Sequence, residues 1–108
     1  MTVNELIDRA SLTTLALPCP DREVDGAYLG DLLSWVMGRA SQDNAWITIM
    51  SNINVIAVAT LADVSCIVLA EGVKLDTDVM NTAEAKGVNV LSSQLSAYEI
   101  AKLVSGVI

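Results

Sequence analysis

The chain contains no histidine and no phenylalanine, and it has only two cysteines and two prolines among 108 residues. Without histidine, its own side chains can form no Ser-His-Asp triad, no Cys-His dyad and no histidine metal site. Positive charge is also scarce, with 6 Lys and Arg against 13 Asp and Glu, for a formal net charge of -7. This acidity argues against nucleic acid and membrane partners, because both attract basic surfaces.

The two cysteines are too few for a disulfide framework. Cys19 lies between two prolines, and Cys66 begins an apolar run, so we expect both thiols to be reduced and structural. Charged residues interrupt the N-terminal segment, which therefore does not resemble a secretory signal. No apolar run reaches the roughly 20 residues that a membrane span needs. We therefore expect a cytoplasmic protein.

Hydrophobic residues make up 53% of the chain, which is too many for a disordered protein. The length suits one domain, and no linker, repeat or low-complexity segment divides it, so we predict a single domain over 1–108.

Hydrophobic periodicity and capping residues predict an alternation of strands and helices. Thr2 and Glu5 have the spacing of a capping box, and so do Ser96 and Glu99. Short links join the elements from Trp46 onward, which favours parallel strands with helices on both faces. We predict a three-layer α/β/α domain with a mainly parallel sheet of about 4–5 strands. The expected strands cover 12–17, 45–50, 65–70 and 88–91, and the expected helices cover 2–10, 31–40, 55–62, 76–86 and the segment from 96 onward.

The expected helix over 55–62 is apolar nearly all round. Such a helix is either enclosed in the core or faces another subunit. In so short a chain complete burial is difficult, so an oligomer interface is a real alternative. Trp35 and Trp46 are expected to be core or interface residues.

Ligands of open parallel sheets bind beyond the carboxyl ends of the strands. Here the segments that follow the predicted strands are 18–26, 51–54, 71–72 and 92–93, which are rich in small polar and acidic residues. The turn over 51–54 could present backbone N–H groups to an anion. Alternatively, Asn52 or Asn54 only caps the next helix.

Four acids lie between Asp21 and Asp31, and clustered carboxylates can hold Mg²⁺ or Ca²⁺. Their spacing lacks a calcium-loop pattern, so a solvated loop in which Arg22 pairs with a carboxylate is favoured, and no metal is predicted. Asp31 is expected to cap the following helix. The chain has neither a GxxxxGK[ST] nor a GxGxxG sequence, and we predict no cofactor and no catalytic residues.

The segment 21–34 resembles the signature of DRTGG-type domains, because it begins with Asp21-Arg22 and keeps a glycine, Gly26, before the aromatic Tyr28. The segments 43–48, 54–59 and 96–99 resemble its later blocks. The resemblance implies a fold similar to the N-terminal, non-catalytic domain of HPr kinase/phosphorylase. It also implies a regulatory or ligand-sensing role and a tendency to form dimers. The kinase activity of that enzyme belongs to a separate P-loop domain, which this sequence does not contain, so no kinase activity is expected. The chain departs from the family pattern at the Thr-Gly-Gly stretch and at Asn52, where relatives often carry histidine.

Together these observations predict a stand-alone, non-catalytic regulatory domain that binds a small anionic or nucleotide-like ligand at the strand ends. Arg22 would be the contact to the anion. The alternative is a homo-oligomerisation or docking module without a ligand, and a metal-dependent enzyme is a third hypothesis. The candidate ligand-binding residues are Asp21, Arg22, Gly26, Asp31, Ser51, Asn52 and Asn54.

Overall fold

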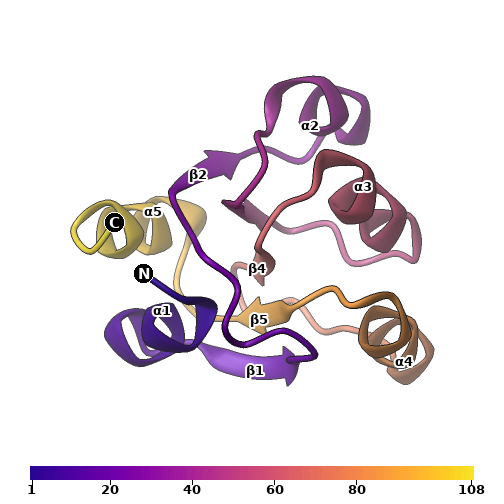
Figure 1. Cartoon of the computed structure of the whole chain (residues 1–108), viewed down its shortest axis with the longest axis horizontal. Coiled ribbons are helices and arrows are strands. Elements are labelled where there is room, and N and C mark those ends of the chain that lie inside the picture. The colour runs from indigo at the N-terminus through magenta and orange to yellow at the C-terminus, as the bar shows by residue number, and fades with distance from the viewer.

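A computed structural model describes all residues 1–108, which form a five-stranded sheet covered by helices on both faces (Figure 1). The strand order is β1-β5-β4-β3-β2. Strands β2 to β5 are parallel, and only β1 is antiparallel, to its neighbour β5. The predicted three-layer, mainly parallel architecture is thus confirmed. The strands are β1 (Thr13–Ala16), β2 (Gly26–Leu29), β3 (Asn44–Thr48), β4 (Cys66–Leu69) and β5 (Val90–Ser92).

Two helices cover one face of the sheet and three cover the other (Figure 1). The first pair is α1 (Val3–Ala10) and α5 (Ala97–Ser105). The opposite layer holds α2 (Leu33–Arg39), α3 (Asn54–Ala62) and α4 (Thr77–Lys86). None of these helices is long and apolar enough to cross a bilayer.

Alternate side chains of the central strands serve two separate cores, because successive residues of a strand point to opposite faces. Trp46 and Ile67 belong to the core under α2, α3 and α4, whereas Ile47 and Val68 belong to the core under α1 and α5. Every residue of β4 is buried. This explains the unbroken apolar pattern that the sequence shows for the inner strands.

The two predicted capping boxes are both formed. Thr2 accepts a hydrogen bond from the backbone N–H of Glu5, and Ser96 accepts one from that of Glu99. Gly87 ends α4 with a φ of 74°, as the sequence predicted from its position after the last apolar turn. Local signals therefore set these three helix ends: side-chain caps at the beginning of α1 and α5, and the backbone of a glycine at the end of α4.

The apolar helix α3 divides its surface between core and solvent. Val55, Ile56, Val58 and Ala59 are buried, while the opposite side of the helix is exposed. Of the two tryptophans, Trp46 is a core residue whose Nε1 donates to the carbonyl of Gly30 at 2.8 Å. Trp35 lies on the surface of α2.

The connection from β1 to β2 joins the two opposite edges of the sheet. It runs over residues 17–25, which we call the strap, past the amino ends of β5, β4 and β3 (Figure 1). Its backbone pairs with α1, since Val3 donates to the carbonyl of Arg22 at 2.9 Å. The strap therefore determines the position of two of the predicted site residues, Asp21 and Arg22.

Candidate functional site

The antiparallel direction of β1 separates the predicted site residues into two groups. The parallel strands end together at one border of the sheet, the carboxyl edge, and begin at the other, the amino edge. The strap follows β1, which ends beside the beginning of β5, so the strap lies at the amino edge. The expectation that this loop belongs to the carboxyl edge is therefore wrong. Asp21, Arg22 and Gly26 are therefore at the amino edge, and Asp31, Ser51, Asn52 and Asn54 follow β2 and β3 at the carboxyl edge.

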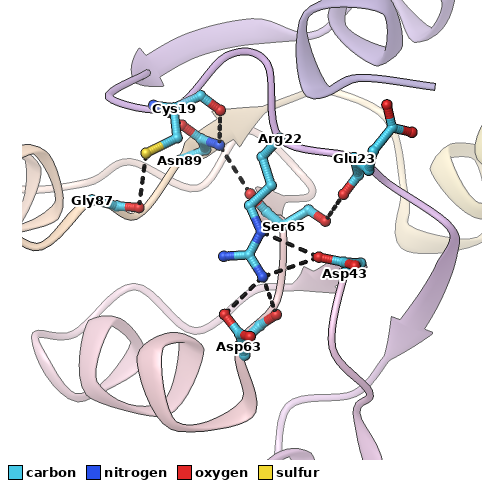
Figure 2. A network of polar contacts seen from close by, with 8 residues as sticks. All are labelled: Cys19, Arg22, Glu23, Asp43, Asp63, Ser65, Gly87 and Asn89. Atoms are coloured by element: carbon cyan, nitrogen blue, oxygen red, sulfur yellow. Dashed lines mark hydrogen bonds and ion pairs between the residues drawn. The ribbon is translucent and has the colours of Figure 1, made fainter.

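Arg22 at the amino edge pairs with two aspartates that precede β3 and β4 (Figure 2). Its Nη2 lies 3.1 Å from Oδ1 of Asp43 and 2.7 Å from Oδ1 of Asp63, and it also donates to the Asp63 carbonyl. Burial opposes the charge of the guanidinium, but the bonds to Asp63 and Asp43 outweigh it and raise the pKa of Arg22. The expected pairing of Arg22 with a carboxylate thus exists, with partners outside the acidic loop.

Asn89 fastens the beginning of the strap to the strands (Figure 2). Its Oδ1 accepts from the backbone N–H of Cys19 at 2.9 Å. Its Nδ2 donates to the carbonyl of Cys19 at 2.8 Å and to that of Ser65 at 3.0 Å. Asn89 itself is only 1% exposed, and its amide provides hydrogen-bond partners for the part-buried backbone of Cys19 and the buried carbonyl of Ser65.

The remaining contacts of the amino edge are also internal. Ser65 donates through Oγ to the carbonyl of Glu23, and the Sγ of Cys19 lies 3.7 Å from the carbonyl of Gly87. Burial raises the pKa of the nearby Cys66 thiol to about 12, so this thiol stays protonated at neutral pH. The amino edge is therefore a structural network, in which the charge of Arg22 is already compensated.

At the carboxyl edge, Asp31 connects the ends of two neighbouring strands. Its Oδ1 accepts from Oγ1 of Thr48 at 2.7 Å and from the backbone N–H of Ile49 at 3.0 Å. The prediction that Asp31 caps the following helix is wrong, because α2 begins after Leu32 without a side-chain cap. The carboxylate instead satisfies groups at the end of β3.

The turn after β3 combines Ser51, Asn52 and Asn54. Asn52 accepts from the backbone N–H of Asn54 at 2.9 Å, a bond within the turn, whereas α3 itself begins after Ile53 without a side-chain cap. Asn52 and Asn54 have exposed side chains, and Ser51 is half-buried. Whether this turn binds a ligand stays a prediction.

A polar cavity of about 250 Å³ opens at the carboxyl edge beside the ends of β4 and β5. The loops after these strands are held together, since Gly72 donates through its backbone to the carbonyl of Ser93 at 2.9 Å. Gly72 has a φ of 68°, a left-handed conformation that favours glycine, and an added Cβ would displace the end of the Gln94 side chain. The cavity is lined by Leu15, Gly72, Val73, Lys74, Leu75, Ser92 and Gln94.

The segments after β4 and β5 were among the predicted strand ends, but none of their residues was a predicted site residue. One signal was available, because Lys74 is the only Lys or Arg in the segments that directly follow the four parallel strands. Ser92 and Gln94 carried no comparable signal. No three Asp, Glu or Cys side chains lie close enough together to hold a metal ion.

Comparison with known proteins assigns a family. The model of the DRTGG domain family matches residues 31–107. The chain belongs to the DRTGG domain family. The match begins at residue 31, so only residues 31–34 of the first block of the resemblance, 21–34, lie within the matched residues. No curated protein sequence matches the chain.

The fold of this DRTGG domain is similar to a solved regulatory region from Clostridium perfringens pyrophosphatase, which contains CBS and DRTGG domains and is complexed with its activator, diadenosine tetraphosphate. The TM-score is 0.70 at 11% sequence identity, so the similarity is one of fold. It covers 95% of this chain but only 45% of that one. The chain thus spans less than half of the length of that regulatory region.

Proposed function

We propose that this DRTGG domain is a non-catalytic regulatory domain that senses a small anionic, nucleotide-like ligand at the carboxyl edge of its sheet. One observation carries the proposal. Lys74, the only cation in the segments that follow the parallel strands, lines a cavity together with Ser92 and Gln94. A cation beside neutral hydrogen-bonding groups suits a phosphate group.

The size of the cavity suits part of a nucleotide. A volume of about 250 Å³ is below that of most pockets for complete drug-sized ligands. The phosphate portion would bind beside Lys74, and the rest of the ligand would extend along the edge toward Asn52 and Asp31. Neighbouring strands lie about 4.8 Å apart, so the edge from β5 to β2 spans roughly 14 Å.

The nucleotide class is also supported by the pyrophosphatase region of similar fold, whose activator is diadenosine tetraphosphate. In this proposal Arg22 does not contact the anion, because it is paired at the opposite edge. Both cysteines are free thiols, which suits the reducing cytoplasm that we propose as the compartment.

Thermal shift measurements followed by calorimetric titration test this function. The probes are diadenosine tetraphosphate, ATP, AMP and inorganic phosphate. We expect at least one nucleotide to raise the melting temperature of the wild type, and Lys74→Ala to abolish that rise. Lys86→Ala is the matched control, because Lys86 is equally exposed but lies outside this cavity. The absence of any shift, or an unchanged response of Lys74→Ala, would refute the proposal.

A second candidate function is self-association into a homodimer. The observation that favours it is the exposed side of α3, which carries apolar and uncharged residues only. The two functions are compatible, because this surface lies on the helical layer and the ligand cavity lies beside the ends of β4 and β5. Sedimentation as a function of concentration tests the second candidate.

A further inference from the structure

The exposed side of α3 is a straight stripe along the helix. Ile53 is 48% exposed and Leu61 is 73% exposed, the highest value among the large apolar residues of the chain. Ala57 lies midway between them, one helical turn from each. Asn54 and Thr60 are the other exposed residues of this side, so the stripe consists of Ile53, Asn54, Ala57, Thr60 and Leu61.

This stripe forms one wall of the largest cavity of the domain, a groove of about 470 Å³ between α3 and α4. Thr82 and Lys86 of α4 line the other wall, and Lys86 is the only charged residue of the groove. The chain as a whole has a formal charge of -7. The lining of the groove contains no acidic side chain. Two copies that meet at this groove therefore avoid the direct repulsion between carboxylates that contacts through acidic parts of the surface would bring.

The stripe is also symmetric in sequence about its centre. The apolar Ile53 and Leu61 lie four residues before and after Ala57, and the polar Asn54 and Thr60 lie three residues before and after it. A surface that forms a twofold contact must match itself when rotated.

We propose that two copies of the domain pair their α3 helices antiparallel, with Ala57 at the twofold axis. This inference rests on the proposed self-association and adds its geometry. Ile53 of each copy packs against Leu61 of the other. The small side chain of Ala57 allows the helix axes to approach closely at the centre.

The polar positions and the helix ends fit the same arrangement. The Asn54 amide of one copy donates to Oγ1 of Thr60 in the other, while this hydroxyl keeps donating to the carbonyl of Ile56, 3.0 Å away in its own helix. Antiparallel packing also brings the positive end of each helix dipole beside the negative end of the other. Leu61, the most exposed large apolar side chain, enters the partner groove beside Ile56.

Analytical ultracentrifugation from about 5 to 200 µM tests the pairing, because a contact of two short helices has low affinity. We expect a reversible monomer–dimer equilibrium for the wild type. Ala57→Glu places two carboxylates at the axis and should give a monomer at every concentration. Ala85→Glu is the matched control, since Ala85 is an exposed alanine of α4 that does not line the groove, and it should still form dimers.

Oxidative cross-linking tests the geometry by itself. Ala57→Cys places two thiols across the twofold axis and should give a covalent dimer, whereas Ala85→Cys should not. A wild type that is monomeric at 200 µM would refute self-association altogether. A wild-type dimer that survives Ala57→Glu, or that gives no cross-link through Ala57→Cys, would refute the α3 geometry while leaving self-association intact.

Discussion

At the scale of single residues, Arg22 and Asn89 hold the strap in place. Arg22 bridges Asp43 and Asp63, both of which have a positive φ, at 67° and 58°. Non-glycine residues adopt this conformation at a cost, which the surrounding contacts must offset. The guanidinium bonds are such contacts, so Arg22 is a structural residue in the same loop where the sequence suggested a ligand contact.

Replacement of Arg22 tests this role. We expect Arg22→Ala to lower the free energy of unfolding by about 1 to 2 kcal/mol, since it leaves the partly buried carboxylate of Asp43 and the half-exposed carboxylate of Asp63 without their partner. Urea denaturation followed by circular dichroism measures the change. Arg39→Ala is the control, because Arg39 stacks on the exposed ring of Trp35 at 3.7 Å and should cost less than about 1 kcal/mol. Equal losses for the two variants would contradict a structural role specific to Arg22.

The buried thiol of Cys66 predicts a dependence of stability on pH. Its pKa is raised from 9.0 to about 12 by burial, so above pH 9 the unfolded chain loses a proton that the folded chain keeps. The free energy of unfolding should therefore fall as pH rises between these values, by about 1.4 kcal/mol per pH unit. Cys66→Ala removes this contribution, and the two stability profiles should converge as pH rises. Parallel profiles from pH 8 to 11 would contradict the burial of the thiol.

At the scale of elements, local signals in the sequence were sufficient for most helices and strands. Capping boxes, apolar periodicity and Gly87 act within a few residues, so they can be read without the fold. The direction of β1 could not be read in this way. It depends on pairing between Thr13 and Ser92, which are far apart in the chain, and nothing in the local pattern of β1 distinguishes the two directions. Because of this pairing, Asp21, Arg22 and Gly26 lie at the amino edge of the sheet and not at the carboxyl edge, where they were predicted.

Removal of a capping hydroxyl tests the local account. Ser96→Ala should lower the free energy of unfolding by about 1 kcal/mol, because the first turn of α5 loses its side-chain acceptor. Ser105→Ala, at the other end of the same helix, removes a hydroxyl that only donates to the carbonyl of Lys102 and should change it by less than about 0.5 kcal/mol. Thermal or urea unfolding distinguishes the two. Similar losses would mean that the capping box does not stabilise α5.

At the scale of the whole molecule, the two edges of the sheet have different tasks. The amino edge carries a closed network that fixes the strap (Figure 2). The carboxyl edge carries the cavity beside Lys74. Residues placed by one strand and its following turn, such as Ser51 and Asn52, were predicted in their correct places. The cavity itself was not predictable, since its lining comes from loops after β4 and β5 and from β1, and only the sheet order brings these together.

The net charge of the molecule predicts how salt affects self-association. Two molecules with a charge of -7 repel each other, and the proposed α3 contact adds no ion pair to compensate. Added NaCl screens the repulsion, so the dimer should become more stable between about 0.02 and 0.5 M salt. Sedimentation at both salt concentrations measures this. A dimer that dissociates in salt would contradict an uncharged interface.

Chemical-shift mapping tests the central claim, ligand binding at the carboxyl edge, most directly. The ¹⁵N-labelled domain is titrated with diadenosine tetraphosphate and, separately, with ATP. We expect saturable shifts of the amides of Gly72, Lys74 and Gln94, whereas the amides of Arg22, Asp43 and Asn89 at the amino edge should not shift. Shifts centred on the amino edge, or no shifts at millimolar nucleotide, would contradict it.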